Sequence, residues 1–333
     1  MTMIDTDQAH ETSVKTKPKL ALYWAASCGG CEIAILELHE KVLDIDANFE
    51  LVFWPAAADF KYSHVEAMEP KEIDLCLFNG AIRNSENEHL AHLLREKSKT
   101  LVAFGSCAHE GCIPGLANAT TKEAIYRTVY HESPSTVNPT GVEPLDLYAL
   151  PEGQVTLPEF YESVHTLDQV VDVDYYIPGC PPQAHQVWAV IELILSGAPM
   201  PPIGSVVGAG EDTCCEECPR TRQEKRITRF VRPHEIIPDP DICLLDQGII
   251  CLGPATRSGC GGLCVAAGSP CRGCYGPAPN VVDQGAKMLS ALSSVIDATE
   301  ESEIQAIINQ IVDPIGTLYR FSLPSSMLRR VQS

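Results

Sequence analysis

The chain has 333 residues, of which 45% are hydrophobic and 20% are charged. A chain of this length can bury a sizeable core, and we expect two domains. The formal charge of −20 argues against a nucleic-acid-binding surface, which requires a dominant positive field. No apolar run approaches the roughly 18 residues of a membrane helix, and the polar N-terminus lacks the apolar core of a secretory signal. We therefore predict a cytoplasmic protein with no membrane-inserted segment.

Strands and helices are expected to alternate along the first 200 residues. Short apolar runs predict buried strands, and several of the segments between them show helical periodicity. The predicted strands cover residues 19–26, 49–54, 73–78, 100–104 and 171–177. Helices are predicted after Glu32, from a capping box at Ser85, and over residues 183–195 with Pro182 in the first turn. This pattern predicts a doubly wound parallel α/β sheet of the flavodoxin-like type.

Composition divides the rest of the chain. Residues 131–159 are rich in Pro, Ser, Thr and Gly, so we expect an extended excursion that packs over the sheet domain. Two amphipathic helices are predicted at residues 280–296 and 301–311, covering a Cys-rich region. The predicted organisation is a disordered or extended N-terminus at 1–18, a flavodoxin-like domain at 19–200 and a smaller C-terminal domain at 201–333.

Four cysteines follow predicted strands. Cys28 and Cys31 follow the first strand, Cys107 follows the fourth and Cys180 follows the fifth. Because the carboxyl ends of parallel strands meet at one edge of a sheet, these thiols should converge where such folds bind ligands. Neighbouring glycines let the backbone turn sharply and bring its N–H groups close to a ligand. The sequence therefore predicts a four-thiolate site built from three distant segments.

Nine of the 15 cysteines lie between residues 214 and 274, among Gly and Pro instead of in apolar runs. Turns of this kind let several sulfurs converge, which indicates metal sites. The spacing suits both zinc and iron–sulfur clusters, since both take four thiolates. Disulfides are less favoured, because the chain is long and no secretory signal precedes it. From the residues alone, three interpretations stay open. In order of preference, they are iron–sulfur clusters, zinc sites, and disulfide-bonded or unligated thiols.

The ordered motifs resemble those of a known family. Cys-x-x-Cys-Glu at residue 28, Gly-Ser-Cys-Ala with a following Ile-Pro-Gly, and Pro-Gly-Cys-Pro-Pro resemble the small subunit of [NiFe] hydrogenases and the homologous cluster-bearing subunit of respiratory complex I. The downstream Cys-x-x-Cys-Pro-Arg, Gly-Ile-Ile-Cys-Leu-Gly-Pro-Ala-Thr-Arg and Pro-Cys-Arg-Gly-Cys most resemble the small (gamma) subunit of cytoplasmic F420-non-reducing (methyl-viologen-reducing) hydrogenases. The resemblance spans residues 19–277 and favours iron–sulfur clusters over zinc.

This resemblance implies three [4Fe–4S] clusters that carry electrons away from H2 oxidation. The implied ligands are Cys28, Cys31, Cys107 and Cys180 for a proximal cluster, Cys260, Cys264, Cys271 and Cys274 for a medial cluster, and Cys215, Cys218, Cys243 and Cys251 for a distal cluster. The nickel–iron site is implied to lie in a separate large subunit, so this chain alone is expected to be inactive. The implied acceptor is heterodisulfide reductase, reached through a small iron–sulfur subunit. The sequence does not fix the final acceptor, the stoichiometry or the cluster potentials.

Three cysteines remain outside these sets. Cys76 lies in an apolar run and is expected to be a buried core thiol. Cys112 stands where relatives usually carry Gly and competes with Cys107, which we favour because it follows the strand more closely. Cys214 competes with Cys215 for the pairing with Cys218, and the Cys-x-x-Cys spacing favours Cys215.

Other features keep two interpretations. Glu32 is either a proton relay or a solvated carboxylate at a helix start, where the helix dipole favours it, and no other catalytic residue is predicted. A basic run is interpreted first as a solvated face, with cluster-charge compensation or docking of an acidic partner as alternatives; it consists of Arg220, Arg222, Lys225, Arg226, Arg229 and Arg232.

For the function of the whole chain, a complex I-like cluster subunit and a zinc-scaffolded interaction protein stay open beside the hydrogenase electron-transfer subunit. The complex I-like alternative is disfavoured because such chains end soon after Pro-Gly-Cys-Pro-Pro.

Overall fold

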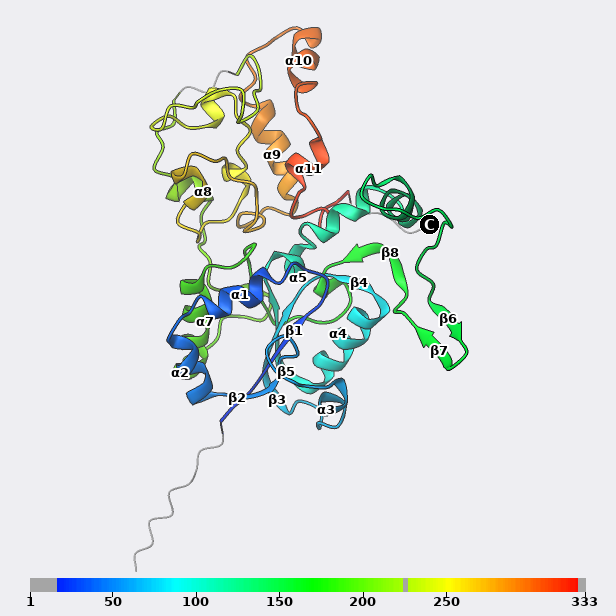
Figure 1. Cartoon of the computed structure of the whole chain (residues 1–333). Coiled ribbons are helices and arrows are strands. Elements are labelled where there is room, and N and C mark those ends of the chain that lie inside the picture. Colours follow the sequence, from blue (N-terminus) through cyan, green and yellow to red (C-terminus); the bar gives the residue numbers. More distant parts are fainter. Residues whose placement is uncertain (1–16, 224–226, 329–333) are drawn as a thin grey trace, which may run out of the picture.

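The computed structural model describes residues 17–223 and 227–328, so the expected N-terminal segment 1–18 lies almost wholly outside the described residues. At its centre is a six-stranded parallel sheet with the strand order β10-β9-β5-β3-β1-β2 (Figure 1). The strands are β1 (Lys19–Trp24), β2 (Glu50–Phe53), β3 (Ile73–Asn79), β5 (Ser98–Phe104), β9 (Tyr175–Ile177) and β10 (Ser205–Val206). This is the strand order of a flavodoxin-like sheet with one strand added at the edge, and the predicted fold class is confirmed.

Both faces of the sheet are buried. In β1, Ala21 and Tyr23 join one hydrophobic core, whereas Leu20 and Leu22 join the other. One face is covered by α3 (Tyr62–Glu66), α4 (Ser85–Lys97) and α5 (Ser106–Glu110), and the other by α1 (Gly30–Leu36), α2 (Lys41–Asn48) and α7 (Ala184–Ser196). Burial on both faces explains why the central strands are almost continuously apolar in sequence.

The starts of two helices differ from expectation. Asn84, not Ser85, caps α4, because its side chain accepts a hydrogen bond from the Asn87 backbone N–H at 2.8 Å. The Ser85 hydroxyl instead accepts a hydrogen bond from the Glu159 N–H at 3.0 Å. The helix α7 is capped by Gln183, so Pro182 precedes the helix and does not lie in its first turn.

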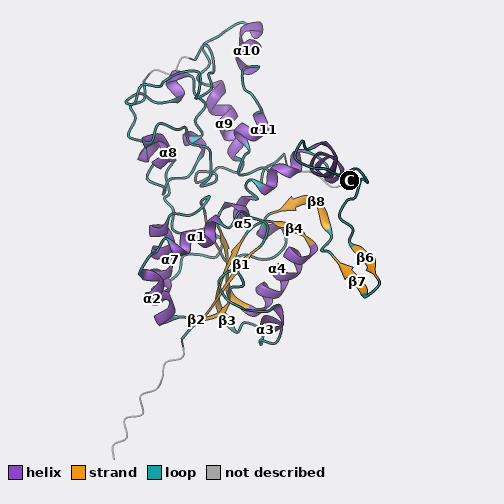
Figure 2. Ribbon diagram, in the orientation of Figure 1, coloured by secondary structure: helices purple, strands orange, loops and turns teal. Residues whose placement is uncertain are grey.

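The predicted excursion does not pack over the sheet. The strands β6 (Leu147–Leu150) and β7 (Gly153–Thr156) form an antiparallel hairpin in which every residue is exposed, and the hairpin extends away from the sheet (Figure 2). The strand β8 (Phe160–His165) then returns and pairs with β4 (Ile82–Asn84). The expectation was wrong because the hairpin satisfies backbone hydrogen bonds within itself and needs no cover from the sheet.

The Cys-rich part has a core of its own with little regular structure. Met288 and Leu292 pack there with Leu318 and with cysteines that include Cys251 and Cys271. The tail helices thus pack on the Cys-rich region, although they are shorter than predicted, and the domain boundaries stay a prediction. The remaining α-helices are α6 (Lys122–Tyr126), α8 (Leu263–Ala266), α9 (Gln284–Ser293), α10 (Glu301–Ile308) and α11 (Pro314–Leu318). The segment η2 (Arg127–Glu132) is a π-helix, and the 3-10 helices are η1 (Pro114–Ala119), η3 (Leu167–Gln169), η4 (Cys214–Glu217), η5 (Leu245–Gln247) and η6 (Gly253–Ala255).

Candidate metal centres

A first group of thiols lies in the loops at the carboxyl edge of the sheet. Cys28 follows β1, Cys107 follows β5 and Cys180 follows β9, while Cys31 lies in the first turn of α1. Gly105 has a φ of +82°, and a Cβ added there would lie 2.3 Å from the Cys31 sulfur, so the turn before Cys107 closes directly on Cys31. The Cys31 thiol also lies within electrostatic range of Cys28 and Cys180. The structure brings the four thiols together, and their role as ligands stays a prediction.

A fifth thiol, that of Cys112, belongs to the same group. Its sulfur lies 3.6 Å from the Cys180 sulfur and also contacts the Cys107 thiol. The backbone of Cys112 has a φ of +45°, and its N–H donates a hydrogen bond to the Phe321 carbonyl at 3.0 Å. The sequence analysis names Cys112 as a competitor of Cys107 for this site, and the preference for Cys107 as ligand stays a prediction.

The second group contains the four cysteines expected at a medial site. Cys264 and Cys274 lie within electrostatic range of the Cys260 and Cys271 thiols, and Cys274 packs with Cys107, Cys112 and Cys180 of the first group. The Ser106 hydroxyl donates a hydrogen bond to the Cys274 carbonyl, which ties the second group to the loop after β5. The Cys214 thiol lies near Cys260 and Cys271, and it also lines the pocket of the third group.

The third group forms a pocket. Its wall contains the four cysteines expected at a distal site and a fifth, Cys214, together with two arginines and apolar residues; the others include Cys215, Cys218, Cys243, Cys251, Arg220, Arg222, Leu245 and Val265. A Cβ added at Gly253 would lie 2.9 Å from the Cys215 sulfur and 3.8 Å from the Cys251 sulfur, so both sulfurs face this glycine. Cys215 is therefore grouped with Cys218 as the spacing predicts, and its neighbour Cys214 lies between the second and third groups.

The chemistry of these thiols fits a bound metal. Burial is the largest cause that raises the pKa of Cys31 and Cys274 above the ordinary range, and it raises the pKa of Cys251 to about 12. Thiols buried in this way stay protonated unless a cation replaces the lost water, and a coordinated metal deprotonates its thiol ligand outright. All 15 cysteines fall within the described residues, and none of them is in a disulfide. Among the described residues, no three His, Cys, Asp or Glu side chains are arranged around a single metal ion.

The basic run is exposed at Arg222, Arg229 and Arg232, as a solvated face requires, and Arg220 is the exception. Arg220 is buried, and its guanidinium donates hydrogen bonds to the carbonyls of Val265, Asp239 and Ile242 at 3.0, 2.6 and 3.0 Å. It therefore fixes the loops that surround the third group. Arg222 is exposed beside Glu216, and Lys225 and Arg226 lie outside the described residues.

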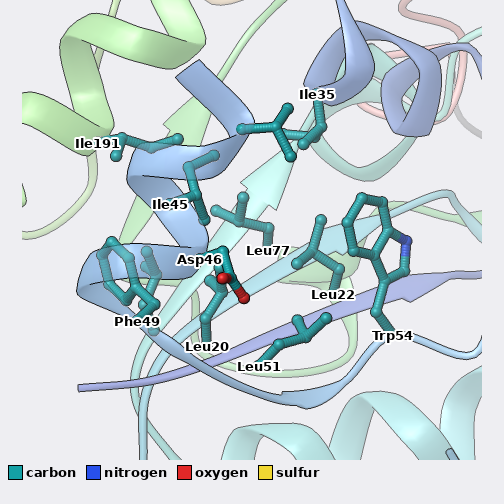
Figure 3. Close-up of a pocket in the computed structure, with 12 residues that line it drawn as sticks. Leu20, Leu22, Ile35, Ile45, Asp46, Phe49, Leu51, Trp54, Leu77 and Ile191 are labelled. Atoms are coloured by element: carbon teal, nitrogen blue, oxygen red, sulfur yellow. The ribbon is translucent and has the colours of Figure 1, made fainter. Parts of the chain in front are cut away.

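Glu32 is not the solvated carboxylate that one interpretation expected, because it is only 6% exposed. The Trp54 indole N–H donates a hydrogen bond to it, and the Asn79 side-chain amide donates a second at 3.4 Å. Burial raises the pKa of Glu32. The same Trp54 ring lines an apolar pocket beneath α2 with Leu22, Leu77 and other residues, and the described residues around that pocket include no cysteine (Figure 3). A role for Glu32 in proton transfer stays a prediction.

Comparison with known proteins decides the family. The model of the family "NADH ubiquinone oxidoreductase, 20 Kd subunit" matches residues 28–194. The iron–sulfur subunit of the F420-non-reducing hydrogenase of Archaeoglobus profundus is 43% identical over 318 residues, which are 94% of this chain and 98% of that protein. The chain belongs to this family of hydrogenase iron–sulfur subunits.

Further relatives carry related names. The corresponding subunit of the F420-non-reducing hydrogenase of Methanothermobacter thermautotrophicus is 35% identical, over 94% of this chain and 96% of that protein. Among solved structures, one chain of an NAD+-reducing [NiFe]-hydrogenase in the H2-reduced state is 28% identical with a TM-score of 0.48, over 56% of this chain and 96% of that chain. The chain described here, as a hydrogenase subunit, is part of an oxidoreductase. Within the described residues, none of its helices has the length and apolar character needed to span a membrane.

Proposed function

We propose that this hydrogenase subunit holds three [4Fe–4S] clusters and transfers electrons from H2 oxidation in a large subunit towards an acceptor subunit. The first group of thiols would hold the proximal cluster, the second the medial cluster and the third the distal cluster, through the twelve cysteines named for them above. Such clusters supply reversible one-electron oxidation and reduction. The chain itself would bind the clusters, shield them from water and set their reduction potentials.

The observation that carries the proposal is that consecutive groups adjoin. Cys274 of the second group packs with Cys107 and Cys180 of the first, and the Ser106 hydroxyl bonds to its carbonyl. At the other end, the Cys271 N–H of the second group donates a hydrogen bond to the Cys251 sulfur of the third at 3.3 Å. Because consecutive groups are in direct contact, clusters held there would be close neighbours. A continuous series of redox centres is what electron transfer through a subunit requires.

Backbone N–H groups stabilise negative charge on the cysteine sulfurs of these groups. The N–H groups of Gly253 and Cys271 bond to the Cys251 sulfur, and those of Gly262 and Leu263 bond to the Cys260 sulfur; both sets lower the pKa of the thiol that they contact. Hydrogen bonds to sulfur stabilise the more negative state of a cluster, so this chain can set reduction potentials through its loops.

The large subunit is proposed to cover the loops of the first group. Cys28 is exposed there, and several apolar side chains near it are unusually exposed: Trp24 (44%), Ile33 (54%), Leu36 (53%) and Ile113 (49%). Apolar exposure of this kind favours a protein interface. The acceptor would then approach the third group. That this acceptor is of the heterodisulfide reductase type, reached through a small iron–sulfur subunit in the cytoplasm, rests on the family resemblance.

The complex I-like alternative is less well supported. The matching family model ends at residue 194, and the nine cysteines of residues 214–274 lie beyond it. A function that uses only the first group leaves the second and third groups without a purpose.

An anaerobic purification of the chain with its large subunit tests the proposal. We expect about twelve iron and twelve sulfide per chain, as three four-iron clusters require. All clusters should become reduced under H2 when the large subunit is present and stay oxidised when it is absent. A colourless chain that contains zinc would contradict the proposal, and so would hydrogenase activity of this chain alone.

A further inference from the structure

Glu217 connects the third group of thiols to the second. It is the last residue of η4 and is followed directly by Cys218, which lines the pocket of the third group. Its carboxylate bonds elsewhere: Oε1 accepts a hydrogen bond from the Gly259 N–H at 2.8 Å, and Oε2 accepts one from the Gly261 N–H at 3.0 Å. These two N–H groups stand on either side of Cys260. One carboxylate beside the third group therefore holds the backbone on both sides of a ligand expected in the second group.

The turn that carries Cys260 is shaped by this contact. Gly261 and Gly262 have φ values of +68° and +62°, and a Cβ added at Gly262 would lie 2.8 Å from the Glu217 carbonyl oxygen. The turn continues into the N–H groups of Gly262 and Leu263, which bond to the Cys260 sulfur. Hydrogen bonds to a carboxylate are roughly twice as strong as those between neutral groups. Glu217 therefore fixes the conformation in which the turn presents its sulfur.

Glu217 also brings a negative charge to this turn. The preceding Glu216 is different, because its side chain is 63% exposed and pairs with Arg222 at 3.4 Å. Glu217 is half-buried and bonds to uncharged backbone groups. Reduction of an iron–sulfur cluster adds one negative charge, so a carboxylate held beside the cluster opposes reduction and lowers its potential.

We propose that Glu217 is a positioning residue of the medial cluster, which holds the turn of Cys260 in place and keeps the reduction potential of that cluster low. The proposal rests on the proposed function, because it requires a cluster held by the second group. The medial cluster would take one electron from the proximal cluster and pass one to the distal cluster. Glu217 itself gains and loses neither an electron nor a proton in this transfer.

Two variants in the complex with the large subunit, purified anaerobically, test the proposal. Glu217→Gln removes the charge and keeps the shape of the side chain, and Glu216→Gln is the matched control, because it removes the same charge from the exposed neighbour. Iron per chain is measured, and the clusters are followed by electron paramagnetic resonance at controlled potentials, with the medial signal identified as the one that Cys274→Ser alters. We expect full iron in both variants. In Glu217→Gln, the ratio of reduced to oxidised medial cluster at a fixed potential should rise about tenfold, which is about 59 mV for one electron. Glu216→Gln should follow wild type.

An unshifted medial cluster in Glu217→Gln overturns the proposal, and so does an equal shift in both variants, which would be an effect of net charge alone. If Glu217→Gln loses the medial cluster, Glu217→Asp decides, because it keeps the charge. A medial cluster at the wild-type potential in that variant supports the proposal, and its loss or an equally large shift overturns it. A wild-type complex without iron in this chain would overturn the proposed function and this proposal together, whereas full wild-type iron with an unshifted Glu217→Gln overturns this proposal alone.

Discussion

The backbone N–H of Cys271 donates a hydrogen bond to the sulfur of Cys251 across 3.3 Å. The two residues are 20 positions apart in sequence and belong to the second and third groups of thiols. Burial raises the pKa of Cys251 to about 12, and this N–H acts in the opposite direction by stabilising the thiolate. One backbone bond therefore joins two neighbouring groups and favours the charged sulfur that a metal requires.

Gly105 should be indispensable to the first group. A Cβ at this position would lie 2.3 Å from the Cys31 sulfur, and its φ of +82° strains any other residue. Gly105→Ala should displace Cys31, lose the iron of the proximal cluster and destabilise the chain by about 1–3 kcal/mol. Iron content and anaerobic thermal unfolding provide the measurement.

Gly204→Ala is the matched control for that change. Its φ of +88° is nearly the same, but apart from Gly204 itself and its two neighbours in the chain, no described residue has an atom within 4 Å of a Cβ added there. We expect comparable backbone strain with full iron content. Equal iron loss in both variants would show that backbone strain, and not contact with Cys31, is responsible.

Cys107 and Cys112 should differ in importance. Cys107 lies in the turn directly after β5, whereas Cys112 lies beyond α5 and is tied through its N–H to Phe321. We expect Cys107→Ala to lose the signal of one cluster and Cys112→Ala to keep all clusters, as followed by iron content and electron paramagnetic resonance. The reverse ranking would show that Cys112 is the ligand, which its contact with Cys180 at 3.6 Å permits.

Leu36 should contribute to binding of the large subunit. It is 53% exposed at the end of α1, close to the loop that carries Cys28 and Cys31. Leu36→Asp should weaken assembly roughly tenfold or more, because a carboxylate would be buried in the interface at a cost of about 1–3 kcal/mol. The affinity of the variant for the large subunit is compared with that of Leu43→Asp, since Leu43 is 70% exposed on α2, the helix that follows α1.

Hydrogen exchange provides a second test of the same interface. With the large subunit bound, protection should concentrate in the loops around residues 28–32, 107–115 and 180–182. Protection confined to α9 and α10 would contradict the proposed orientation of the subunit.

Glu110 should make stability depend on pH. It is 2% exposed, neither carboxylate oxygen has a hydrogen-bond partner within the described residues, and burial raises its pKa well above the ordinary 4.5. Because the folded pKa lies above the unfolded value, the folded chain binds the proton more tightly. The stability associated with Glu110 is therefore full below the unfolded pKa and falls as pH rises towards the folded pKa, by at most about 1.4 kcal/mol per pH unit.

Glu110→Gln should remove that dependence. Relative to wild type, the variant should gain thermal stability between pH 5 and 8, and the gain should increase with pH. Glu123→Gln on the exposed surface of α6 is the control and should follow wild type. Parallel pH profiles for wild type and Glu110→Gln would contradict the expected cost of the buried charge.

Much of the fold and of the first group was determined by the sequence alone. Apolar runs such as residues 73–78 predict strands because burial on both faces of a parallel sheet leaves no polar face. Once the strands are parallel, Cys28, Cys107 and Cys180 must emerge at the same edge, so their convergence follows from local sequence and strand direction.

Other features were decided only by the tertiary structure, since they depend on contacts between segments far apart in the chain. The bond from Ser106 to the Cys274 carbonyl spans 168 positions, and no local pattern predicts it. The same is true of the burial of Glu32 beneath Trp54 and of Arg220 among three carbonyls, since a charged residue is expected to be exposed until its partners are known. Cys214 shows the limit most directly: spacing leaves it outside every expected ligand set, and only the packing of the Cys-rich core places it in the wall of the third group's pocket.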